Sequence, residues 1–72
     1  MIELVEITCT DNNKTLKASV MKKSDRFLEV AVEGTNTKVT LKKKTPVDRI
    51  YIGRMAGLEF TSTGENIGWS NV

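Results

Sequence analysis

The feature that most constrains the fold is a strict alternation of side chains over residues 27–33, near the middle of the chain. Its apolar side consists of Leu28, Val30 and Val32, and its opposite side begins with Phe27. A period of two residues is typical of a β-strand with one buried face. The alternation therefore predicts a central strand that contributes three side chains to the core.

Two strands are expected to flank the central one as hairpins. Residues 14–22 alternate in the same way and are followed by a polar turn at residues 24–26. Residues 34–37 have turn composition, and residues 38–44 then form a strand that ends at Thr45-Pro46.

Shorter strands are predicted over residues 49–53 and 58–60, joined by a tight connection at residues 53–57. Residues 2–9 favour a strand, with a short helix as the alternative, and the tail from Thr61 is expected to be loosely structured. Close spacing of short strands without a long helix predicts a small all-β barrel. Its predicted core consists of Leu16, Ala18, Val20, Leu28, Val30, Val32, Val39, Leu41, Ile50, Ile52, Leu58 and Phe60.

The length of 72 residues predicts one domain, residues 1–72, with a core that is marginal without further support. Cys9 is the only cysteine and histidine is absent, so neither an internal disulfide nor a Cys/His metal site is expected. Oligomerisation is the remaining way to stabilise so small a core. The N-terminus has no basic region typical of a signal peptide, so an intracellular protein is expected.

Residues that could carry out a reaction are not evident. Cys9 has no histidine to activate it and is interpreted as a buried apolar side chain, while Ser24-Asp25 is ordinary turn chemistry. We therefore expect neither an enzyme nor a cofactor. The basic residues are unevenly distributed, because residues 34–54 hold one acidic residue, Asp48, against Lys38, Lys42, Lys43, Lys44, Arg49 and Arg54.

Two short motifs resemble those of the Sm/LSm family, which includes the Hfq-type RNA chaperones. The first motif is Asp25-Arg26-Phe27-Leu28-Glu29-Val30-Ala31-Val32, in which glutamate stands where the family has asparagine. The second is Ile50-Tyr51-Ile52-Gly53-Arg54, with glycine and arginine in reversed order. The resemblance covers residues 14–61 and is closest to small Sm-like members of cyanophage origin, which would place the protein in the host cytoplasm.

The resemblance implies a strongly bent, five-stranded open barrel over residues 14–61, with residues 1–9 as an added strand or short helix and residues 62–72 as a tail. Such a barrel has two unpaired edges, which the family pairs between neighbouring subunits in a closed ring. The expected partner is therefore a second copy of the chain, in a homo-oligomeric ring of about five to seven subunits by analogy with rings of this class. A membrane is not expected to be a partner.

The resemblance also implies a binding site for single-stranded RNA or DNA. Phe27, after the motif's Asp25, stands at the position that stacks a base, and Arg54 stands at the position that brackets it. Phe27 could equally cover the barrel mouth or a subunit interface, and Arg54 could be a solvated loop charge. Glu29 replaces the amide that reads the base edge, and its carboxylate repels phosphate.

Lys42, Lys43 and Lys44 could follow a phosphate backbone. Alternation separates Lys43 from the other two, so the run makes no single stripe, and a solvated edge that deters aggregation is the alternative.

Two alternative functions follow from these residues. The first is a ring that binds single-stranded nucleic acid in RNA or DNA processing or regulation. The second is a small assembly barrel that binds protein without nucleic acid.

Overall fold

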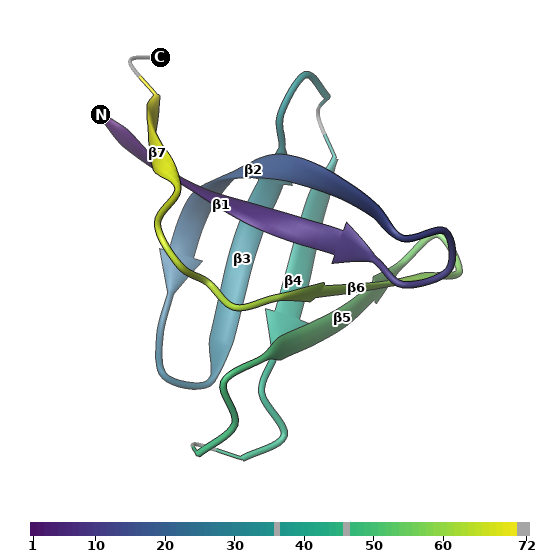
Figure 1. The fold of residues 1–72 in the computed structure, drawn as a ribbon. Helices are drawn as coiled ribbons and strands as arrows, with labels where there is room; N and C mark the ends of the chain where they lie inside the picture. The colour runs from purple at the N-terminus through teal and green to yellow at the C-terminus, as the bar shows by residue number, and fades with distance from the viewer. Residues whose placement is uncertain (36, 46, 71–72) are drawn as a thin grey trace.

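The computed structural model describes residues 1–35, 37–45 and 47–70, and these ranges form antiparallel strands joined by turns (Figure 1). The all-β prediction is confirmed, and the helical alternative for residues 2–9 is wrong because these residues form a strand. Within the three ranges, no helix is long and apolar enough to cross a membrane. The strands are β1 (Ile2–Cys9), β2 (Lys14–Lys23), β3 (Phe27–Val32), β4 (Lys38–Lys42), β5 (Tyr51–Met55), β6 (Leu58–Ser62) and β7 (Gly68–Ser70).

The strands form a closed barrel, not the five-stranded open one that was predicted. The first six strands follow one another around the sheet, and β1 pairs with both β2 and β6, which closes the barrel. β7 pairs outside the barrel with residues 2–4 of β1, so that Ser70 lies opposite Ile2, near the N-terminus (Figure 1). The difference arises because Val5, Ile7 and Cys9 bury their side chains completely or nearly so, which makes β1 a barrel strand. The barrel therefore extends beyond residues 14–61.

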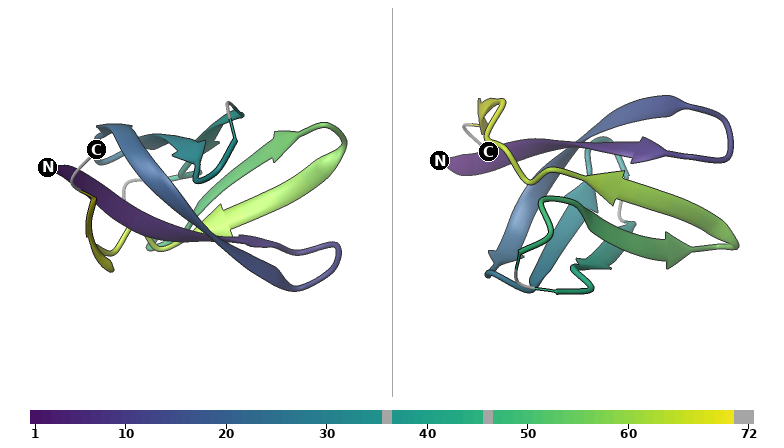
Figure 2. Two further views of the ribbon diagram at one scale, coloured as in Figure 1. Left: turned by 90° about the horizontal axis from the view of Figure 1, so that it is seen from above. Right: turned by 60° about the horizontal axis from the view of Figure 1, so that its bottom comes forward.

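A β-bulge in β2 bends the sheet sharply. Val20 pairs with Val30 and Lys22 pairs with Glu29, so Met21 is an extra residue of β2 without a pairing partner on β3. A bulge strengthens local twist and changes which face the following residues occupy. The bend lets the long strand β2 pair with β1 at one end and β3 at the other, as the two views in Figure 2 show.

The predicted core is largely confirmed. Val30 is completely buried, so the predicted register of the central strand is correct. The other confirmed core residues are Ala18, Leu28, Val32, Val39, Leu41 and Phe60, while Val20 and Ile52 are half-buried. Ser62, in the predicted tail, is also buried.

Three predicted core residues are exposed instead. Ile50 precedes β5, and the alternation there is shifted by one residue, so that Tyr51 is buried in its place. Leu16 and Leu58 do face inward, but they lie on the projecting ends of the β1–β2 and β5–β6 hairpins (Figure 2). β3 pairs with β2 only from Ala18 onward. The β3–β4 hairpin therefore does not cover residues 14–17 of β2, where Leu16 lies.

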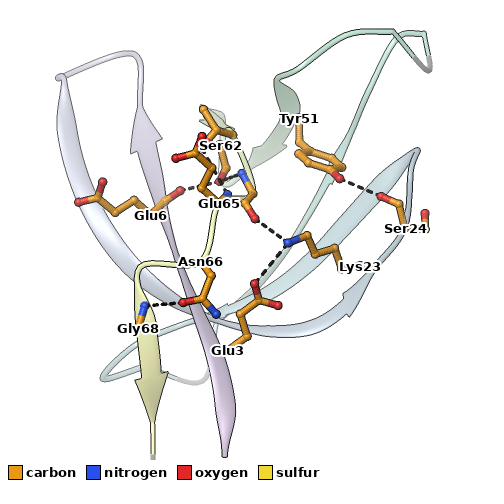
Figure 3. Close-up of polar contacts among 11 residues, drawn as sticks. Glu3, Glu6, Lys23, Ser24, Tyr51, Ser62, Glu65, Asn66 and Gly68 are labelled. Atoms are coloured by element: carbon orange, nitrogen blue, oxygen red, sulfur yellow. Dashed lines mark hydrogen bonds and ion pairs between the residues drawn. The ribbon is translucent and has the colours of Figure 1, made fainter.

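One end of the barrel is closed by polar contacts (Figure 3). The bulge turns Lys23 toward this end, where its Nζ donates to the Gly64 carbonyl at 2.7 Å and lies 3.3 Å from Glu3 Oε2. The Tyr51 hydroxyl donates to the Ser24 carbonyl at 2.8 Å. Buried Ser62 donates from Oγ to the Glu6 carbonyl at 2.6 Å. The segment after β6 is thereby held against the barrel.

Two further sequence predictions need correction. Gly53 and Arg54 belong to β5, so the connection to β6 is only Ala56-Gly57, whose φ angles of 53° and 78° fit a two-residue hairpin turn. The tail contains β7, although Ile67 and Trp69 expose 43% and 56% of their surface. The predicted roles of Asn36 and Pro46, and the last tail residues 71–72, lie outside the described residues.

Candidate nucleic-acid interface

An exposed aromatic side chain and a lysine are neighbours on the outer face of the barrel. Phe27 of β3 pairs with Lys42 of β4, and Lys42 pairs in turn with Ile52 of β5. Directly paired residues in a sheet point to the same face, with Cβ atoms about 4.5–5.5 Å apart. The three side chains therefore form one row, which we call the outer row, across three strands.

The turn before β3 fixes the backbone of Phe27. Ser24 Oγ accepts hydrogen bonds from the amides of Arg26 and Phe27, each at 3.2 Å, and the Ser24 amide donates to the Phe27 carbonyl at 2.9 Å. Asp25 is an exposed residue of this turn, in keeping with its turn chemistry. Phe27 exposes 36% of its surface beside Lys42. Its ring is thus an aromatic surface on a fixed backbone, and solvent can reach it.

The lysine run divides between two faces, as its alternation predicts. Lys42 lies on the outer row, whereas the Lys43 ammonium lies 4.6 Å from the centroid of the buried Tyr51 ring. This distance is typical of a cation–π contact. Lys43 is therefore partly engaged in closing the barrel end, and Lys42 and Lys44 are the more exposed lysines of the run.

Glu29 and Arg54 share the outer face but lie one row farther along. Glu29 is half-buried and has Lys22 and Thr40 as its cross-strand partners. Arg54 is two residues beyond Ile52 on the outer side of β5 and pairs with Glu59. The structure thus brings Phe27 and Lys42 together and places Arg54 on the same face, beside an acidic residue.

Arg26, in the turn before β3, and Arg49, in the loop between β4 and β5, are cationic residues that the sequence motifs did not single out as site residues. Arg26, Lys43, Lys44 and Thr45 line one hollow. A second, adjoining hollow is lined by Lys44, Asp48, Arg49, Ile50, Ile52 and Thr61. The signal that could have identified Arg26 and Arg49 is their position: Arg26 precedes Phe27, and Arg49 belongs to the basic segment.

Asp48 helps to hold this loop in shape. Its Oδ2 accepts from the Thr45 amide at 3.1 Å, and its own amide donates to the Thr45 carbonyl at 3.1 Å. The only acidic residue of the basic segment thus has a structural partner within the loop. The arrangement can bind an anionic chain and stack a ring. In the part of the chain that the structure describes, no group of three or more histidine, cysteine, aspartate or glutamate residues could hold a metal ion.

No protein-family model, no curated protein and no solved structure matches the chain. The assignment of function therefore depends on the residues themselves.

Proposed function

We propose that this protein is a non-catalytic barrel that binds single-stranded RNA or DNA on the outer face of β3, β4 and β5. The observation that carries the proposal is the register of Phe27 with Lys42, which puts an exposed ring next to an exposed positive charge. Single-stranded nucleic acid is bound by this combination, since bases stack on aromatic rings and cations track the phosphates.

The surroundings of the outer row support the same ligand. Ile52 is an apolar side chain on the other side of Lys42 from Phe27, and Lys44 and Arg49 line the hollow that Ile52 shares. The resemblance to the Sm/LSm family supports this face too, because Phe27 and Arg54 stand at the family's stacking and arginine positions. None of these groups reads a particular base edge, so we expect weak binding with little sequence preference.

Replacing Phe27 by alanine should weaken binding without unfolding the barrel. Loss of a stacking ring costs about 1–3 kcal/mol per base. Fluorescence anisotropy with labelled oligo(U), oligo(A) and single-stranded DNA, at two salt concentrations, measures the change. Trp69→Ala is the matched control, because Trp69 is an exposed aromatic on β7, outside the proposed face. Equal losses for the two variants would contradict a stacking role specific to Phe27.

The second variant in the same titration is Glu29→Asn. It removes a negative charge from the binding face and restores an amide that can read a base edge, so binding should strengthen. If the wild-type protein shows no binding at low salt, and Glu29→Asn creates none, the nucleic-acid proposal is wrong.

We also propose that the functional form is a homo-oligomeric ring. Because β1 closes the barrel, unpaired barrel edges no longer give a reason for subunits to pair. The ring proposal therefore rests on the small core and on the Sm/LSm resemblance. Light scattering at micromolar concentration should give a mass several times 8.0 kDa. A monomer would overturn the ring and leave the binding face of the single barrel intact.

An assembly protein is the second candidate, and one observation favours it. β7 is a short outer strand that displays Trp69 with 56% of its surface exposed. Exposed aromatic residues are enriched at protein interfaces. The titration distinguishes the two functions, because a protein-binding barrel would leave the oligonucleotides unbound at low salt.

A further inference from the structure

We infer that the hollow lined by Arg26, Lys43, Lys44 and Thr45 is a phosphate subsite, which takes one phosphodiester group of the bound strand. This inference rests on the proposed function and adds Arg26 and Thr45 to the residues proposed to bind nucleic acid. The hollow has a volume of about 310 Å³. Three of the lining residues carry cationic side chains and the fourth has a hydroxyl, so every described lining residue can donate to phosphate oxygens.

The backbone of the subsite is fixed before any ligand binds. The Lys43 amide donates to the Arg26 carbonyl at 2.8 Å, which ties the start of β3 to the end of β4. The Arg26 amide donates to Ser24 Oγ, and the Thr45 amide donates to Asp48 Oδ2. A fixed backbone lowers the entropic cost of binding an anion, because only the side chains remain to be ordered. The Lys43 ammonium is further restrained above the Tyr51 ring.

The neighbouring hollow differs in chemistry. Its lining includes Ile50 and Ile52 as well as the carboxylate of Asp48, which suits a sugar or base better than a phosphate. Lys44 lines both hollows. Ile52 belongs to the outer row with Phe27 and Lys42 and also lines the second hollow, so Lys44 connects the outer row to the proposed subsite.

The subsite predicts a distinct response from Arg26→Ala and Lys44→Ala. Each should lower oligo(U) affinity and reduce the slope of log affinity against log salt by about 0.7, the value for one lost contact with a single strand. Lys38→Ala is the matched control, since Lys38 is an exposed lysine at the opposite end of β4. It should leave the slope unchanged.

A second measurement uses inorganic tripolyphosphate, which has phosphates but no bases. It should compete weakly with oligo(U) and shift the amide NMR signals of Lys44 and Thr45, and Arg26→Ala should abolish these shifts. If tripolyphosphate binds as tightly as oligo(U), and Phe27→Ala weakens neither, the subsite serves a free polyphosphate and the backbone assignment is overturned.

The outcomes separate the subsite from the proposed function. If Phe27→Ala weakens oligo(U) binding while Arg26→Ala and Lys44→Ala behave like Lys38→Ala, the subsite is wrong and the stacking face stands. If wild-type protein binds no oligonucleotide but tripolyphosphate still shifts the Lys44 and Thr45 signals, the proposed function fails and an anion site remains. Absence of both signals overturns both.

Discussion

Substitution of Gly53 by alanine is expected to destabilise the barrel severely. A Cβ atom at this position would lie 2.3 Å from the Thr40 carbonyl oxygen and 2.7 Å from Leu41 Cδ2. Overpacking usually costs about 1–3 kcal/mol, and a clash with backbone cannot be relieved by a rotamer change, so we expect about 3 kcal/mol or more. Urea denaturation monitored by circular dichroism measures the loss.

Gly34→Ala provides the matched control. Gly34 has φ of 81°, yet nothing lies within 4 Å of the Cβ that alanine would add. Only backbone strain of about 1–2 kcal/mol is expected there. If Gly53→Ala costs no more than Gly34→Ala, then β5 does not lie against β4 as the structure has it. The result bears on the whole barrel, because among the described residues Lys42 and Ile52 are the only backbone pair that joins β4 to β5.

The close approach at Gly53 illustrates what local pattern can and cannot predict. Alternation along β3 and β4 predicted the buried residues correctly, because both strands have one face in the core throughout their length. The same reasoning failed at β5, where Ile50 and Ile52 were expected inside and Tyr51 is buried instead. Two isoleucines are more apolar than one tyrosine, but Tyr51 can satisfy its hydroxyl by donating to the Ser24 carbonyl.

Pairing between strands that are distant in the sequence is the larger feature that the sequence analysis does not predict. The sequence predicts that residues 2–9 form a strand, but no local pattern indicates that this strand pairs with β2 on one side and β6 on the other. The bulge at Met21 was equally hidden, since it exists only in the register between β2 and β3. It determines that Lys23 turns toward Glu3 and Gly64.

In the candidate site, too, some features follow from the pattern within one strand and others depend on pairing between strands. Phe27 and the separation of Lys43 from Lys42 followed from alternation within one strand. The pairing of Phe27 with Lys42 depends on the register between β3 and β4, and Arg26 lines one hollow with Lys44 only because the fold brings them together. The motifs therefore identified single residues, while the row and the hollows required the structure.

The pair Ile7 and Leu16 offers a direct test of the closed barrel. These residues are cross-strand partners on β1 and β2, and both face inward. Ile7 is completely buried, whereas Leu16 exposes 40% of its surface. Ile7→Ala should cost about 2–5 kcal/mol through lost burial and a residual cavity. Leu16→Ala should cost about 1 kcal/mol or less, since solvent already reaches this side chain.

Urea titration of both variants, at equal protein concentration, measures the difference. An open barrel over residues 14–61 makes the opposite prediction, because Leu16 would then be a core residue and Ile7 would lie outside the core. Similar costs for the two variants, or a larger cost at Leu16, would therefore show that β1 does not close the barrel in solution. A large cost at Ile7 alone would establish that the N-terminal strand completes the core beneath the outer row.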